Sequence, residues 1–293
     1  MKRTQQSILP DELIRQLQDS IGSKQVSADL LDLSAVAADA SHYLLTPGAL
    51  VRATTADDVA CAMTAARRHK VSLTFRSGGT SLSGQGLTDG IMVDTRRAFR
   101  GIEVFDEGRR VRVQPGATIR AVNTALARYQ RKLGPDPASS VACTVGGVLA
   151  DNSSGMSCGT IANSYQTLES MVIVLASGTV LDTADPDADD KLCSTEPELV
   201  ETLLRLRETC RRPEHAERIR HLFSMKNTMG YGLNSFLDHD SPSQILSHLM
   251  IGSEGTLGFI ASAVMRTLPV MPQISTCLLY TSDAADERSS VDI

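Results

Sequence analysis

Arg76-Ser-Gly-Gly-Thr-Ser-Leu-Ser-Gly-Gln-Gly86 lies between two apolar runs, residues 71–75 and residues 91–94. Its glycines let several backbone N–H groups turn toward one point and let a ligand approach the main chain, and its serine and threonine hydroxyls add further donors. This composition predicts a loop that holds an anion, in the first place a phosphate or pyrophosphate. A flexible surface turn is the alternative, and one glycine-rich loop alone does not decide between the two.

Two familiar phosphate-binding loops do not fit this segment. A Walker A loop needs Lys and then Ser or Thr after its last glycine, whereas Gly84 is followed by Gln85 and Gly86. A Rossmann loop opens into a long helix, but here glycines interrupt any such helix and a new strand is expected from Ile91. We therefore expect the loop's own N–H groups, not a helix dipole, to hold the phosphate, in a nucleotide-binding fold other than the Rossmann fold.

Two further regions are rich in small residues. Residues 134–160 contain Gly134-Pro-Asp-Pro-Ala-Ser139, Thr144-Val-Gly-Gly147 and Asp151-Asn-Ser-Ser-Gly155, where prolines disfavour a helix and Gly and Asn suit tight turns. Residues 252–260 read Gly-Ser-Glu-Gly-Thr-Leu-Gly-Phe-Ile and lead into an expected strand that ends near Leu268. Three separated loops of this kind indicate a long dinucleotide that lies across the fold.

Together these regions resemble the FAD-binding domain of the vanillyl-alcohol oxidase / p-cresol methylhydroxylase family (PCMH-type). Within it, the branch of D-lactate dehydrogenases and glycolate oxidase subunits is the most similar, through residues 134–139, Asn163-Ser-Tyr-Gln-Thr167 and Lys226-Asn-Thr-Met-Gly-Tyr231. The resemblance covers residues 43–272. It implies an α+β fold of two α/β lobes, non-Rossmann, with FAD between them.

The resemblance also implies which residues bind FAD. The first loop would hold the pyrophosphate, with Arg76 contributing charge or, equally, forming a buried structural ion pair. Many relatives carry His where Thr80 stands and use it to attach FAD covalently, so we expect non-covalent FAD here. Cys158 is a conceivable thiol near the flavin, with a packing role as the favoured alternative. The expected FAD-binding residues are Arg76, Ser77, Gly78, Gly79, Thr80, Ser81, Pro135, Asp136, Ser139, Thr144, Gly146, Gly147, Asn152, Glu254, Gly255, Gly258 and Ile260.

The reaction implied is oxidation of a D-2-hydroxy acid, in the first place D-lactate. Hydride would pass to flavin N5 while a base takes the hydroxyl proton, and electrons would continue to a quinone, cytochrome or iron–sulfur acceptor. The catalytic residues are unknown, because in the family they belong to a cap domain; Lys226, Asn227 and Tyr231 are candidates, with an exposed turn as the alternative. Another flavoenzyme of this fold (a sugar-alcohol oxidase or ether-lipid synthase type) or an inactive flavin-binding fragment remains open.

The last residues break the family pattern. Reverse translation of the core of residues 273–293 resembles a sequencing adapter, and an authentic polar tail is the alternative. We expect an N-terminal helical segment at 1–42, the FAD-binding domain at 43–272 with a helical insertion at about 190–225, and a non-native tail at 273–293. The cap domain is expected to be absent, so that the chain is truncated at its C-terminal side.

The composition of the chain argues against several other classes of function. The chain has 293 residues, 42% of them hydrophobic, and a net charge of −5 without a basic block, which argues against nucleic acid. Its 6 cysteines form no Cys-x-x-Cys pair, so neither a zinc nor an iron–sulfur site is expected, and no metal is expected. With no apolar run that could span a bilayer and no signal segment, we expect a cytoplasmic protein, free or peripheral to the inner membrane. Its expected partners are a small hydroxy acid and an electron acceptor or iron–sulfur domain or subunit.

Caps and periodicity predict the remaining elements. Thr55 is expected to cap a helix to about Lys70, and Thr118 a helix through Arg131. Further helices are expected at 11–21, 196–210, 213–223 and 243–250. Strands are expected at 47–51 (an edge strand), 71–75, 91–94, 101–105 and 110–114, with a hairpin of 171–176 and 179–182 and a loop at 185–190.

Overall fold

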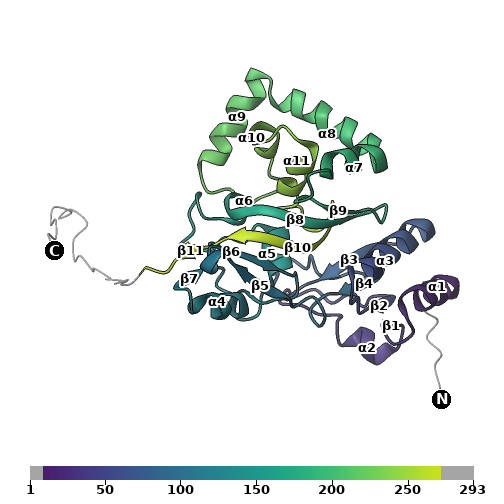
Figure 1. The fold of residues 1–293 in the computed structure, drawn as a ribbon. Helices are drawn as coiled ribbons and strands as arrows, with labels where there is room; N and C mark the ends of the chain where they lie inside the picture. Colours follow the sequence, from purple (N-terminus) through teal and green to yellow (C-terminus); the bar gives the residue numbers. More distant parts are fainter. Residues whose placement is uncertain (1–8, 272–293) are drawn as a thin grey trace, which may run out of the picture.

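Two β-sheets lie next to each other, and helices cover their outer sides (Figure 1). The computed structural model describes residues 9–271, so the tail expected at 273–293 lies outside the described residues. The first sheet has four strands in the order β1-β2-β4-β3, and the second has five in the order β5-β6-β10-β8-β9. This mixed architecture confirms the α+β prediction.

The four-stranded sheet is parallel in its centre. β2 and β3 both pair with β4 in parallel, and β1 adds an antiparallel strand to β2. The expected edge position of residues 47–51 is therefore wrong: β2 lies between β1 and β4, and all its side chains are buried. Sequence patterns could not show this, because β1 has only two residues. The strands are β1 (Val26–Ser27), β2 (Ala49–Val51), β3 (Leu73–Arg76) and β4 (Ile91–Asp94).

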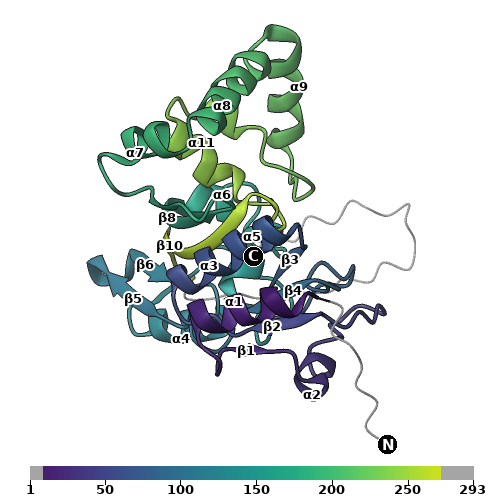
Figure 2. The ribbon, with the colours of Figure 1, turned by 90° about the vertical axis from the view of Figure 1, so that its right-hand side faces the viewer.

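Helices α1 (Asp11–Ile21) and α3 (Ala56–His69) pack on this sheet and also contact each other (Figure 2). The predicted cap of α3 is present: Asp58 N donates to Thr55 Oγ1 at 3.1 Å, and Thr55 N donates to Asp58 Oδ2 at 3.1 Å. Helix α2 (Leu30–Ser34) precedes β2. Apolar side chains of α1, α3 and β4 share one core with Val174 and Phe259 of the second sheet, so the two sheets are packed as one body.

The five-stranded sheet is antiparallel, with β10 between β6 and β8. Besides its contact with the four-stranded sheet, this sheet packs on α4 (Ile119–Ala127), α5 (Val145–Asp151) and α11 (Pro242–Leu249). A 3₁₀ turn, η1 (Asp106–Gly108), joins β5 to β6, and α6 (Ser164–Thr167) leads into β8. The predicted hairpin is confirmed as β8 and β9. The strands are β5 (Ile102–Phe105), β6 (Arg110–Val113), β8 (Leu168–Leu175), β9 (Val180–Asp182) and β10 (Gly258–Arg266).

Several boundaries differ from the sequence predictions, and two of the differences change the local structure. Thr118 caps α4 as expected, but the helix ends at Ala127, because Gln130 has a left-handed φ of 54° and the chain then forms β7 (Arg131–Lys132), paired with β11 (Leu268–Pro269). The loop expected at 185–190 is wrong from Ala188 on, where α7 (Ala188–Thr195) begins and buries its first residue.

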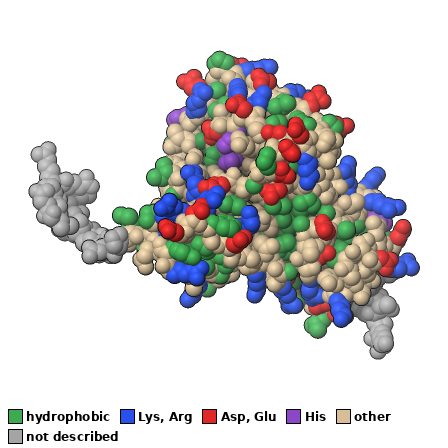
Figure 3. All heavy atoms as spheres, viewed as in Figure 1, with side chains coloured by type: hydrophobic (Ala, Val, Ile, Leu, Met, Phe, Trp, Pro, Cys, Tyr) green, Lys and Arg blue, Asp and Glu red, His purple; other side chains and the backbone are tan. Residues whose placement is uncertain are grey.

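A group of helices covers the far side of β8 and β9 (Figure 1, top). It consists of α7, α8 (Pro197–Cys210), α9 (Pro213–Ser224), α10 (Ser235–Asp238) and α11. On the face shown in Figure 3, acidic and basic side chains are interspersed. No helix in residues 9–271 has the length and apolar run that a membrane crossing requires.

Candidate functional site

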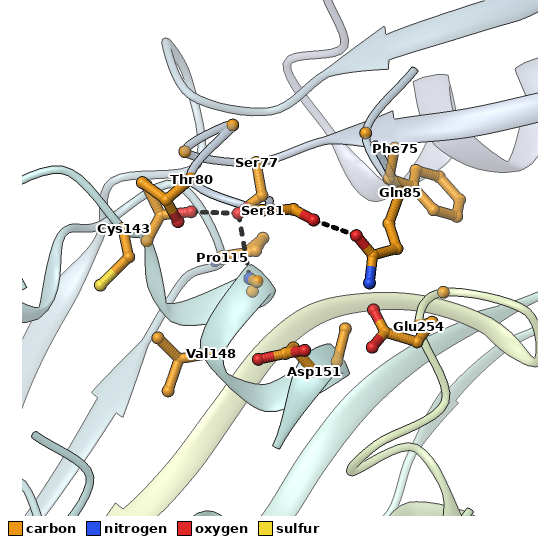
Figure 4. A pocket seen from close by; sticks show the side chains of 18 of the residues that line it. Phe75, Ser77, Thr80, Ser81, Gln85, Pro115, Cys143, Val148, Asp151 and Glu254 are labelled. Carbon is orange, nitrogen blue, oxygen red and sulfur yellow. Dashed lines mark hydrogen bonds between the residues drawn. The ribbon is translucent and has the colours of Figure 1, made fainter. Parts of the chain in front are cut away.

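A cavity of about 640 Å³ lies between the two sheets and is lined by all three regions that the sequence singled out (Figure 4). Its wall is formed by residues 73–75 of β3 and by parts of residues 77–86, 139–153 and 253–260, with Thr95 and Pro115. This volume lies within the range of sites for small molecules and cofactors. Segments almost 180 positions apart thus meet around one space.

The first loop has unused backbone donors where it lines this cavity. Among residues 9–271, the N–H groups of residues 78–82 donate to no protein acceptor. Gly79 has a φ of 67°, and a Cβ at Gly78 would lie 2.5 Å from the Ala142 carbonyl oxygen, so neither position tolerates a side chain without a shift. A row of unpaired N–H groups with glycine backbones is an anion-binding geometry.

Ser77 connects the first loop to the second region. Its Oγ accepts a hydrogen bond from Gly147 N at 3.0 Å and hydrogen-bonds to Thr144 Oγ1. The Ser77 hydroxyl is thereby engaged inside the protein, although Ser77, Thr80 and Ser81 all line the cavity. Ser77 thus orients the loop through α5.

Arg76 lies behind the loop and does not line the cavity. Its side chain is 6% exposed; Nη2 donates to Ala38 O at 2.6 Å and Nη1 to Gly86 O at 3.4 Å. Within residues 9–271 no carboxylate comes within 4.0 Å of it, so the expected alternative of a buried ion pair is not found. Burial, and after it the Arg96 cation, lowers the pKa of Arg76. The guanidinium group lies directly beneath Gly79, whose Cβ would stand 2.8 Å from Arg76 Nη2.

The second region contains a helix that the sequence analysis did not expect. Gly146 and Gly147 lie in the first turn of α5, not in a loop, because Pro135 and Pro137 disfavour a helix only before this turn. A Cβ at Gly146 would lie 2.5 Å from the Pro115 Cβ, so the glycine permits close packing. The first N–H groups of α5 are already used by acceptors of the protein: Val145 N donates to Ala117 O, Gly146 N to Pro115 O and Gly147 N to Ser77 Oγ.

The third region approaches the cavity from the start of β10. Gly255 has a φ of 76°, and a Cβ at Gly258 would lie 2.7 Å from the Val174 carbonyl oxygen, so both glycines are required by the backbone. Phe259 packs on Phe75 at 5.0 Å between ring centroids, which closes the wall with an apolar contact. Glu254, Gly255, Gly258 and Ile260 all line the cavity, and their contact with FAD stays a prediction.

Besides Arg76, three further predicted cofactor residues lie away from the cavity wall. Pro135 and Asp136 precede it, and Asp136 accepts hydrogen bonds from Ser157 N at 3.3 Å. Asn152 ends α5 with a left-handed φ of 55° and donates to Asn227 O at 3.5 Å. These residues shape the second region, and the structure gives them no direct place at the cavity.

The catalytic candidates also lie outside this cavity. Lys226 Nζ donates to Gly155 O, and Tyr231 OH lies 2.7 Å from Thr256 Oγ1. They attach residues 225–231 to the second and third regions. Cys158 is buried, its thiol donates to Ser154 O at 2.9 Å, and burial raises its pKa, so the packing role is favoured over a thiol near the flavin.

Sequence reasoning did not assign several polar residues of the wall, among them Gln85, Cys143, Asp151 and Ser253. Asp151 lies beside Glu254, and partial burial, followed by the Asp151 carboxyl group, raises the pKa of Glu254 to about 7. No Lys, Arg or His is among the residues that line the cavity. A pattern could not have found the carboxyl pair, because its members are more than 100 positions apart.

Comparisons with known proteins agree with this geometry. Residues 47–184 match a family model described as an FAD binding domain. The chain is 33% identical over 267 residues to a D-2-hydroxyglutarate dehydrogenase of Pseudomonas putida, covering 88% of this chain and 26% of that protein. It is 25% identical over 247 residues to a D-lactate dehydrogenase of Archaeoglobus fulgidus, covering 83% and 43%.

Among solved structures, an alkyldihydroxyacetonephosphate synthase has a similar fold, with a TM-score of 0.60 at 19% identity, covering 90% of this chain and 41% of that one. At this identity the likeness concerns the fold alone. The chain spans about a quarter of the length of the D-2-hydroxyglutarate dehydrogenase that it matches (26%).

Proposed function

The chain carries an FAD-binding domain of the vanillyl-alcohol oxidase / p-cresol methylhydroxylase family, and from this premise we propose that it serves in the oxidation of a D-2-hydroxy acid. D-lactate is the substrate that the sequence predicts. D-2-hydroxyglutarate is the second candidate, because the relative with the higher identity is a D-2-hydroxyglutarate dehydrogenase. The electron acceptor that we propose is a quinone, a cytochrome or an iron–sulfur domain or subunit.

One observation carries the cofactor assignment: the unpaired N–H groups of residues 78–82 lie on the wall of a 640 Å³ cavity. The residues present fit FAD. Gly78, Gly79 and Gly255 line the cavity with main chain alone, and the buried Ser253 hydroxyl has no partner within the described residues. We propose that the N–H groups of the first loop hold the pyrophosphate, and that Arg76 adds positive charge from behind.

Bound FAD supplies a two-electron acceptor for the hydride of the hydroxy acid. The chain's own residues bind and orient it: Ser77 fixes the first loop on α5, while Phe75, Val148 and Phe259 line the same cavity with apolar side chains that limit water. Thr80 has no ring nitrogen for a covalent link, so we propose that FAD is held without a covalent bond. The base and the groups that select the substrate are expected outside the residues named here.

The test is anaerobic reduction of the purified chain after reconstitution with FAD. The proposal predicts that D-lactate or D-2-hydroxyglutarate bleaches the flavin absorption and that L-lactate does not. The comparison of the two D-acids decides between the two candidate substrates. A chain that binds FAD but is bleached by neither acid contradicts the dehydrogenase proposal and favours the alternative of a flavin-binding module without activity.

A further inference from the structure

A short segment that precedes β2 lies behind the first loop. Residues 38–45, which we call the strap, fold back on themselves through a β-bridge between Ala38 and Leu44. No residue of the strap lines the cavity, and none of its side chains is buried. The strap also precedes residue 47, where the match to the FAD binding domain model begins. Because it buries no side chain, its position depends mainly on its hydrogen bonds to neighbouring segments.

These hydrogen bonds join the strap to the first loop and to the end of β3. Ala40 N donates to Gly79 O at 2.9 Å, and Arg76 Nη2 donates to Ala38 O at 2.6 Å. The second guanidinium nitrogen, Arg76 Nη1, donates to Gly86 O at 3.4 Å. Arg76, where the loop begins, thus connects the strap with the residue where the loop ends.

The bond at Gly79 sets the direction of one donor of the loop. In a trans peptide, the C=O group and the N–H group of the next residue point to opposite sides. Because the strap holds Gly79 O, the Thr80 N–H is directed away from the strap. This N–H has no acceptor in the part of the chain that the structure describes, and Thr80 lines the cavity. The strap therefore fixes an unpaired donor in place for a ligand.

The charges behind the loop do not serve an anion in a simple way. A Cβ at Gly86 would lie 3.5 Å from Arg76 Nη1 and 3.8 Å from Asp39 Oδ2, so both groups stand against the same glycine. The Asp94 carboxylate, which also acts on the Arg76 charge, is already paired with Arg96 at 2.7 Å. A carboxylate behind the loop repels a pyrophosphate in front of it. The place of Asp39 therefore indicates a role toward Arg76 and the strap.

Resting on the FAD-binding function proposed above, we infer that Arg76 and Asp39 are positioning residues: they hold the strap against the first loop and thereby keep the loop in the form that binds the pyrophosphate. Neither residue lines the cavity. Asp39 also shapes the strap, because its Oδ1 accepts from Ser41 N at 2.8 Å. Tyr43 adds a contact farther along the loop, where a Cβ at Gly84 would lie 2.9 Å from Tyr43 Cδ2.

The affinity for FAD, measured by flavin fluorescence, separates positioning from charge by its sign. If Asp39 acted on the pyrophosphate through its charge alone, Asp39→Asn would tighten binding; as a positioning residue, its loss weakens binding roughly threefold. Arg76→Lys keeps the charge but lacks the planar fork that spans two carbonyl oxygens. We expect it to weaken binding roughly tenfold, as loss of a hydrogen bond from a charged group allows. Unchanged or tighter binding in either variant overturns the inference.

The ion pair of Arg52 and Asp32 provides matched controls near the same sheet. Arg52 Nη2 lies 2.7 Å from Asp32 Oδ1, and neither residue lines the cavity. Arg52→Lys and Asp32→Asn should leave the affinity for FAD within about twofold of the unaltered chain. If these controls lose as much affinity as the two strap variants, the effect is a general loss of stability and the inference fails.

Hydrogen exchange followed by mass spectrometry tests the coupling without any substitution. Saturating FAD should slow exchange in the strap roughly threefold or more, as reciprocal coupling requires, although the strap does not line the cavity. A peptide from α9 should be unaffected. Without cofactor, the strap should exchange faster in Arg76→Lys, because Ala38 O loses its donor.

Strap exchange that stays the same in both comparisons overturns the inference and leaves the cofactor assignment intact. A chain that binds no FAD at any concentration contradicts the proposed function instead. In that case the exchange measured without cofactor still decides whether Arg76 holds the strap: equal rates in the unaltered chain and in Arg76→Lys overturn it.

Discussion

Individual glycines place the first loop where a ligand can reach its main chain. Gly78 packs against the backbone of residues 142–144, and Gly79 combines a left-handed φ of 67° with a position directly over the Arg76 guanidinium. Side chains at these points would displace the loop from its unpaired N–H orientation. We therefore expect FAD binding to depend on Gly78 and Gly79 more directly than on any hydroxyl in the loop.

Gly79→Ala is expected to weaken FAD binding by roughly tenfold or more. Its Cβ would lie 2.8 Å from Arg76 Nη2, in addition to about 1–2 kcal/mol of left-handed backbone strain. Gly230→Ala is the matched control: its φ is 71°, but nothing lies within 4 Å of its added Cβ. Isothermal titration with FAD should separate the two variants, and equal affinities would show that the contact with Arg76 does not matter.

Single elements show why some boundaries follow from sequence and others do not. Helix α3 starts at a reciprocal cap between Thr55 and Asp58. The two residues are three positions apart, so the sequence alone predicts this start. Strands β1 and β7 have two residues each and exist only because distant partners, β2 and β11, lie beside them. Tertiary pairing, which a single sequence does not display, thus turned an expected edge strand into an interior one.

Thr55→Ala is expected to lower the free energy of unfolding by about 1 kcal/mol, because Asp58 N loses its acceptor at the start of α3. Thr195→Ala is the control: it removes a hydroxyl that bonds to Lys191 O inside α7, where the change should stay within about 0.5 kcal/mol. Urea denaturation at neutral pH measures both. A loss no larger than that of the control would contradict the capping role.

The packing of α10 and α11 predicts a pH dependence of stability. His248 stacks on His239 with 3.9 Å between ring centroids, and burial, followed by the His239 charge, lowers the pKa of His248 from 6.5 to about 4. Below pH 6.5 the unfolded chain binds a proton that the folded chain does not, so stability falls with pH between 6.5 and about 4. From pH 7.5 to pH 5 this loss is about 2 kcal/mol.

His248→Gln should remove most of this loss, whereas the exposed control His215→Gln should retain it. The readout is the urea midpoint of each variant at both pH values. If the unaltered chain and His248→Gln lose the same stability on acidification, the buried histidine is not the cause.

At the scale of the whole molecule, the site forms where two sheets and three distant segments meet. The sequence predicted the three segments, their cofactor and the α+β fold. The spacing of the glycines in these segments is visible locally, and the segments resemble those of a known family. It did not predict that Arg76 lies behind the loop, that Gly147 donates to Ser77, or that Asp151 stands beside Glu254. These relations depend on how the sheets pack, as does the contact of Phe259 with Phe75.

The central claim is that this cavity holds FAD without a covalent bond. Its most direct test is a titration of the purified chain with FAD, followed by denaturation with acid and removal of the precipitated protein. The account predicts saturation at one FAD per chain and recovery of all the flavin in the supernatant. A chain that binds no FAD, or one that keeps the flavin in the precipitate, would contradict it.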